Sequence, residues 1–134
     1  MAEAPPGARA RPLSPFLTIW RWHVTMATSI LHRATGVALY GGALILAGWA
    51  FALARGGVAY NAYMAMLGSV LGKLVLFGIT VSAFYHLGNG VRHLVWDMGQ
   101  GFSVRSADRS AVAVIAFAVA ASVAVWAVGL TGSF

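Results

Sequence analysis

Cysteine is absent from the 134-residue sequence, so the chain forms no disulfide bond. Without thiolates it also cannot hold an iron–sulfur cluster, a thiolate-ligated haem or a covalently attached c-type haem. Any redox centre bound by these residues would therefore depend on histidine or methionine side chains.

Charge is also scarce, because only 9% of the residues are charged while 60% are hydrophobic. Soluble domains carry about 25% charged residues. No run alternates apolar and polar residues as a barrel strand does, so we expect an all-α integral membrane protein. The net charge of +6 comes from cations that flank apolar runs. Membrane orientation explains this pattern, and nucleic acid is not an expected partner.

Charged residues divide the chain into three apolar stretches, each near the roughly 20 residues that a membrane-spanning helix needs. We predict spans over about residues 30–54, 68–92 and 110–131, within a transmembrane domain of residues 29–134. Residues 1–28 are expected to form a cytoplasmic segment with an interfacial part, and residues 57–69 an interfacial helix. The Gly68-x-x-x-Gly72 spacing could mark a helix-dimerisation contact, or it could be chance.

The basic residues predict the orientation. Seven of the nine lysines and arginines lie in the N-terminal segment or between the second and third spans, and only Arg55 and Lys73 flank the first connection. Because the side richer in cations is cytoplasmic, we expect the N-terminus inside and Phe134 outside.

The stretch YHLGNGVRHLVWD ends the second span with unusually polar residues. His86 lies six residues before Arg92, which places it about 9 Å inside the cytoplasmic boundary. His86 and His93 are nearly two helical turns apart and share a face. Gly90 falls between them on that face and leaves room for a flat ligand.

A second polar cluster, SILHRATG, begins the first span. Ser29, His32 and Arg33 are spaced so that they share one helix face. By the orientation above, both clusters occupy the cytoplasmic half of the membrane. Ionisable groups at that depth are costly, which makes them candidates for function.

The two clusters together suit a haem b beside a quinone pocket. A neutral imidazole such as that of His86 is a good axial ligand for haem iron. Haem propionates need cations, and quinone oxygens need hydrogen-bond donors such as Ser29 and Arg33. The candidates for the propionates are His32, Arg33, Arg92 and His93. His86 and His93 are about 10 Å apart along one helix, so they cannot both bind one iron, and His32 is expected to lie too near the boundary. If a haem takes two histidines, we therefore expect the second to come from another chain.

Structural roles compete with each of these assignments. The two arginines can simply mark the cytoplasmic boundary, and the two shallower histidines can be solvated at the interface. Ser29 can bond to its own helix, and His86 can bond to a neighbouring one. His23 is expected at the interface, while Asp97 is open to pairing with an arginine or a helix end.

Two segments, Arg11–Gly36 and His86–Asp97, resemble the signatures of the cytochrome b membrane-anchor subunit of succinate dehydrogenase, respiratory complex II. The resemblance implies a flavoprotein, an iron–sulfur subunit and a second small anchor as partners, with haem b and ubiquinone bound in the membrane. It implies that His86 ligates the haem iron opposite a histidine of the second anchor. Ser29 and Arg33 would then line the quinone site, with His32 near a propionate.

Phe16 and Trp20 depart from the family pattern, which often has His and Tyr at these places; neither is a proposed ligand. The predicted function is that of a non-flavin subunit of succinate:quinone oxidoreductase, with no succinate-oxidising residues on this chain. Alternatives are the anchor of a quinol:fumarate reductase, a haem-free structural anchor and an unrelated membrane cytochrome.

The expected location is the bacterial inner membrane, with several spans, the N-terminus cytoplasmic and the C-terminus periplasmic. The first twenty residues contain neither the apolar run of a secretory signal nor the Arg- and Ser-rich pattern of a transit peptide.

Overall fold

A computed structural model describes residues 19–131, and within them all regular structure is helical. The helices are α2 (Val24–Arg55), α3 (Gly57–Gly68), α4 (Val70–Asp97) and α5 (Val104–Thr131). Of these, α2, α4 and α5 are long and apolar enough to cross a membrane, which confirms the all-α fold with three spans. Most of the expected N-terminal segment, and Phe134, lie outside the described residues.

Several helix boundaries differ from those expected from the sequence: α4 ends at Asp97 instead of near residue 92, and α5 begins at Val104 instead of near residue 110. At two others, a cap explains the difference. α2 begins at Val24, earlier than expected, because the ring of His23 caps it by accepting a hydrogen bond from the Thr25 backbone N–H at 3.4 Å. The second span begins at Val70, where Ser69 caps α4 by accepting from the Gly72 N–H at 3.1 Å. Gly68 therefore ends α3 while Gly72 belongs to α4, so the two glycines share no helix face, which favours chance as the reading of their spacing.

The connections depend on glycine where the backbone turns. Gly56, with φ of 92°, separates α2 from α3, and Gly99, with φ of 77°, follows α4. Both angles fall in the left-handed region, which other residues adopt only at a cost. Residues 57–68 form the helix expected there, and the Tyr63 hydroxyl donates to the Ile45 carbonyl at 2.8 Å, which fixes α3 on α2.

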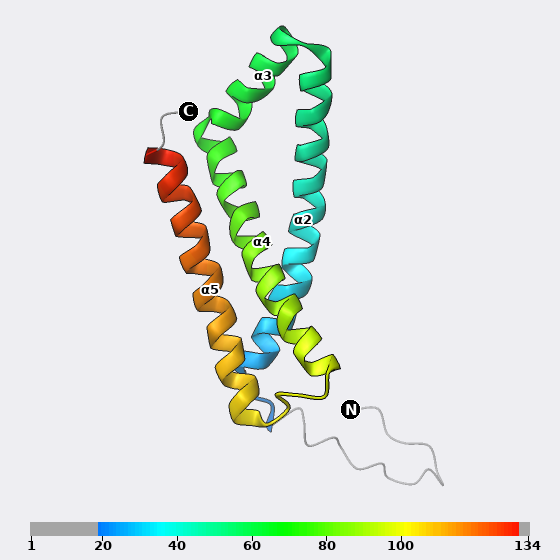
Figure 1. Cartoon of the computed structure of the whole chain (residues 1–134), viewed down its shortest axis with the longest axis vertical. Coiled ribbons are helices and arrows are strands. Elements are labelled where there is room, and N and C mark those ends of the chain that lie inside the picture. The colour runs from blue at the N-terminus through cyan, green and yellow to red at the C-terminus, as the bar shows by residue number, and fades with distance from the viewer. Residues whose placement is uncertain (1–18, 132–134) are drawn as a thin grey trace, which may run out of the picture.

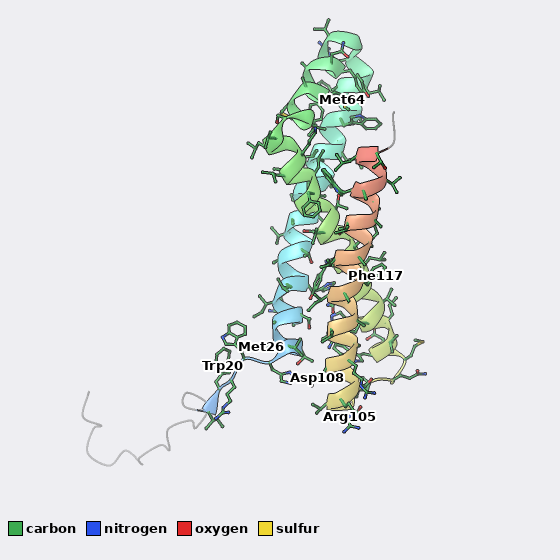
Figure 2. All side chains as sticks on the ribbon, turned by 90° about the vertical axis from the view of Figure 1, so that its left-hand side faces the viewer. Trp20, Met26, Met64, Arg105, Asp108 and Phe117 are labelled. Atoms are coloured by element: carbon green, nitrogen blue, oxygen red, sulfur yellow. The ribbon has the colours of Figure 1, made fainter. Side chains whose placement is uncertain are left out.

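α4 lies between α2 and α5 (Figure 1), and it packs against both. The start of α2, the end of α4 and the start of α5 meet at one end of the bundle, here called the loop end. α3 joins α2 to α4 at the opposite end, the α3 end. Figure 2 shows Trp20, Met26 and Asp108 near the loop end and Met64 near the α3 end.

The interior of the bundle is built from small and polar side chains. Ala111, Val114 and Ala118 of α5 are buried, and so are Thr28, Ser82, Asn89, Arg92 and Ser122. Large apolar side chains point outward instead; Val37, for example, is 75% exposed. Because lipid gives apolar groups no reason to gather inside, small interfacial residues and interhelical hydrogen bonds hold such helices together.

Candidate functional site

Three histidines from two helices meet toward the loop end. The rings of His32 on α2 and His86 on α4 are stacked, with centroids 4.0 Å apart and 16° between their planes. The His93 ring lies 5.2 Å from that of His32 and packs edge-on against Trp96. The expected meeting of the two polar segments is thus confirmed for these histidines.

The ring of His86 is held through one of its two nitrogens. Nδ1 lies 3.2 Å from the His32 carbonyl oxygen and 3.3 Å from Thr35 Oγ1, which itself donates to that carbonyl at 2.9 Å. With the Thr35 proton on the carbonyl, both oxygens accept, so this arrangement suits the neutral tautomer in which His86 Nδ1 carries the proton and Nε2 keeps its lone pair. Histidines that bind metal ions commonly donate the other ring N–H in this way, which fixes tautomer and orientation.

Glycines shape the space around His86. A Cβ at Gly36 would lie 3.3 Å from His86 Cε1, so a larger residue there would press on the ring. A Cβ at Gly88 would lie 3.1 Å from Phe117, which shows that this glycine serves the packing of α4 on α5. A Cβ at Gly90 would meet nothing within 4 Å, in agreement with the open space expected there.

Ser29, His32 and Arg33 occupy one turn of α2. Within the described residues, the buried Nδ1 of His32 has no hydrogen-bond partner. Ser29 is half-buried and Arg33 is exposed. Thr28 and Thr35 return their hydroxyl protons to carbonyls of their own helix, but no such bond forms at Ser29, so its hydroxyl is available to another group.

The Arg92 side chain points away from the histidine rings, into the contact between α2, α4 and α5. Its side chain is only 6% exposed and lies over the Trp96 ring, with Cζ 4.1 Å from the centroid. Six residues of α-helix rotate Arg92 well away from the face of His86. The guanidinium donates to Ser110 Oγ at 2.9 Å, Thr28 Oγ1 at 3.1 Å, Asn89 Oδ1 at 3.2 Å and the Ala107 carbonyl at 3.1 Å. It therefore ties α2, α4 and α5 together.

Several residues of the site were not singled out from the sequence. Asn89 Nδ2 lies 3.4 Å from His93 Nε2, and Arg92 holds the amide oxygen of the same side chain. Thr35 and Gly36 position His86. Asn89 could have been recognised from the sequence, because a polar side chain inside an apolar span, one helical turn before His93, needs a hydrogen-bond partner.

The two polar residues left open by the sequence lie at the periphery. His23 caps α2, and its Nε2 is 3.4 Å from Asp108 Oδ1 without hydrogen-bond geometry, so His23 links α2 to α5. Asp97 is exposed at the end of α4, and within residues 19–131 it forms no ion pair with Arg92 or Arg105.

The cluster offers hydrogen-bond donors and ring nitrogens without partners in the described residues, among them His32 Nδ1 and His86 Nε2, rather than a multidentate metal cage. Within residues 19–131, no group of three or more His, Cys, Asp or Glu side chains is arranged to hold a metal ion. The His32, His86 and His93 rings with the nearby Arg33 instead suit a ligand that takes a single imidazole and carries groups that accept hydrogen bonds.

Comparison with known proteins gives consistent results. The family model described as succinate dehydrogenase/fumarate reductase transmembrane subunit matches residues 7–125, which include the whole site. The mitochondrial succinate dehydrogenase cytochrome b560 subunit of Sus scrofa is 40% identical over 118 residues, covering 84% of this chain and 68% of the relative. The succinate dehydrogenase cytochrome b556 subunit of Rickettsia felis is 35% identical over 116 residues, covering 87% and 90%.

Proposed function

Because the chain belongs to the succinate dehydrogenase/fumarate reductase transmembrane subunit family, we propose that it is a membrane anchor that binds haem b and ubiquinone in a succinate dehydrogenase. One observation carries the proposal: the His32 carbonyl holds His86 Nδ1 and leaves Nε2 available as a ligand. Gly90, one turn after His86 on the same helix face, supports the proposal because a Cβ there would meet nothing within 4 Å.

In this proposal His86 would hold the haem iron through Nε2, together with a histidine of a second small anchor. Haem b supplies a one-electron redox centre when bound. His32, whose Nδ1 is without a partner in the described structure, and Arg33 and His93 would donate to the propionates. Gly90 leaves the space that a flat ring system needs.

Arg92 acts through its neighbours in the same proposal. Its guanidinium fixes the amide of Asn89, which in turn contacts His93. Arg92 is hydrogen-bonded to α2, to α5 and to Asn89, and through Asn89 it keeps His93 in place. We therefore assign Arg92 a positioning role rather than direct contact with a propionate.

Ser29 and Arg33 are the proposed quinone residues. The Ser29 hydroxyl and the exposed Arg33 guanidinium lie one turn apart on α2. Quinone reduction develops negative charge on the quinone oxygens, and these two donors would stabilise that charge by charge-assisted hydrogen bonds.

The partners follow from the same proposal. A flavoprotein subunit would oxidise succinate, and an iron–sulfur subunit would carry electrons to the quinone at the loop end. The loop end would face the cytoplasm of a bacterium, since seven of the nine lysines and arginines belong to the segments expected on that side. The opposite end, with the C-terminus, would face the periplasm.

The test is the haem spectrum of the purified complex with His86 replaced by leucine. We expect His86→Leu to lose the low-spin reduced-minus-oxidised band or to convert it to a high-spin one. The control His93→Leu should keep the low-spin haem and shift only its potential. Succinate oxidation by a soluble dye should survive in both, which verifies assembly. An unchanged low-spin band in an assembled His86→Leu complex would remove His86 as the ligand.

A further inference from the structure

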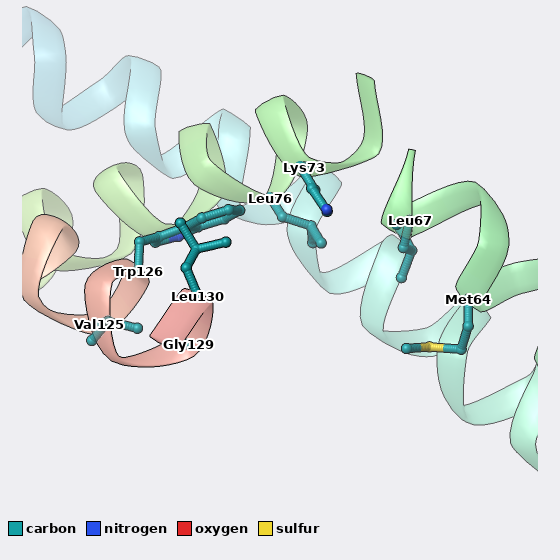
Figure 3. A pocket seen from close by; sticks show the side chains of 9 residues that line it. Met64, Leu67, Lys73, Leu76, Val125, Trp126, Gly129 and Leu130 are labelled. Atoms are coloured by element: carbon teal, nitrogen blue, oxygen red, sulfur yellow. The ribbon is translucent and has the colours of Figure 1, made fainter. Parts of the chain in front are cut away.

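An apolar groove lies at the α3 end, far from the histidine cluster. It has a volume of about 350 Å³, in the range of small-molecule pockets. Residues of α3, α4 and α5 line it, and Figure 3 shows their side chains around the groove. The larger apolar residues of its wall are Met64, Leu67, Leu76, Val125, Trp126 and Leu130. Gly68 and Gly129 also line it, and a Cβ at either position would meet nothing within 4 Å, so both leave the groove open.

Trp126 forms a fixed wall of this groove. Its indole N–H donates to Thr80 Oγ1 at 3.1 Å, and its ring packs edge-on against Phe77 with centroids 5.5 Å apart. These contacts hold the indole in one orientation. The wall that Trp126 forms is therefore a fixed feature of the folded bundle.

Lys73 is the one charged residue that lines the groove. It lies in the first turn of α4, where the helix dipole already makes the potential positive. The acidic residues within 19–131 are Asp97 and Asp108, at the end of α4 and near the start of α5. Both belong to the loop end, so no carboxylate of the described chain neutralises the ammonium group.

Lys73 lies at the depth of lipid headgroups. The 28 residues of α4 span about 42 Å, against a hydrocarbon core of about 30 Å. If the helix is centred, about 6 Å at each end extends into the headgroup region, and Lys73 is about 4.5 Å from the start of the helix. Trp126, near the end of α5, has the position of an interfacial aromatic residue.

We propose that this groove binds one anionic phospholipid, with an acyl chain along the apolar wall and the phosphate at Lys73. An apolar channel with a single cation at headgroup depth, which has no carboxylate partner within residues 19–131, complements both parts of such a lipid. A transmembrane helix from another subunit could also cover the apolar wall. It would neutralise Lys73 only if it carried a carboxylate at the same depth, whereas the phosphate of an anionic lipid lies at that depth in every case. The site is independent of the proposed haem and quinone residues.

The experiment uses the complete purified complex, stripped of lipid and then titrated with phosphatidylglycerol or phosphatidylcholine while bound lipid is counted by native mass spectrometry. One cation near a membrane surface changes the affinity for an anionic lipid about fivefold, so Lys73→Gln should weaken phosphatidylglycerol binding by that factor. Lys73→Arg should retain it. Gly129→Leu, whose side chain would enter the open groove, should reduce binding of both lipids.

Arg55→Gln is the matched control, because Arg55 is exposed at the end of α2 and does not line the groove. It should leave the lipid count unchanged, and dye-linked succinate oxidation should show that every variant is assembled. Three results would each overturn the proposal: equal affinity of wild type and Lys73→Gln, equal affinity for the two lipids, or no lipid retained by the wild-type complex because another subunit fills the groove.

Discussion

Replacing Arg92 with leucine should destabilise the helical bundle, although Arg92 is not a proposed ligand. Three of its hydrogen bonds cross between helices, to Thr28 on α2 and to Ser110 and Ala107 on α5. Interhelical hydrogen bonds in membranes contribute about 0.6 kcal/mol each on average and about 1.7 at most. Arg92→Leu should therefore cost about 2 kcal/mol, with an upper bound of about 5.

The hydrogen bonds lost in Arg92→Leu should affect its former partners unequally. Thr28 still donates to the Thr25 carbonyl, and Ser110 still donates to the Ala107 carbonyl. Asn89 Oδ1 loses the only hydrogen bond to it in the described structure. A double-mutant cycle with Asn89→Leu should therefore show coupling, because removing both members leaves no unsatisfied amide oxygen.

The assay is unfolding of the purified complex in increasing sodium dodecyl sulfate, followed by tryptophan fluorescence. Arg105→Leu is the control, since it removes the same charge from an exposed position of α5. It should shift the free energy of unfolding by less than about 0.5 kcal/mol. Equal stability of Arg92→Leu and wild type, or equal losses for Arg92→Leu and Arg105→Leu, would refute the reasoning.

Two further predictions concern the proposed ligands. Ser29→Ala should lower the rate of ubiquinone reduction about ten- to a hundredfold, the cost of one hydrogen bond to a charged group, while dye-linked succinate oxidation persists; equal loss with both acceptors would indicate failed assembly, and no loss with ubiquinone would place the quinone elsewhere. Gly36→Leu should reduce the haem content of the complex, because the larger side chain would press on the His86 ring. Gly41→Leu is the control and should leave the haem content unchanged, since a Cβ there meets nothing within 4 Å. Equal haem content in the two variants would contradict the proposal that the His86 ring binds haem.

The sequence by itself determined the three spans and the polar positions along them. Apolar length and flanking charge are properties of a single helix in lipid, so they can be recognised without knowledge of its neighbours. The helical repeat alone also places His86, Gly90 and His93 on one face. Helical spacing could not decide between the two readings of Gly68 and Gly72, because a cap at Ser69 divides that stretch between two helices.

Only the tertiary structure decided which polar groups meet. The bond from His86 to the His32 carbonyl joins residues 54 positions apart, and the contact from Arg92 to Thr28 joins residues 64 positions apart. Both depend on the point where α2 crosses α4 and on the rotation of each helix about its own axis. The close packing of small residues fixes these quantities, as Gly36 does against the His86 ring, and no local pattern in the chain encodes them.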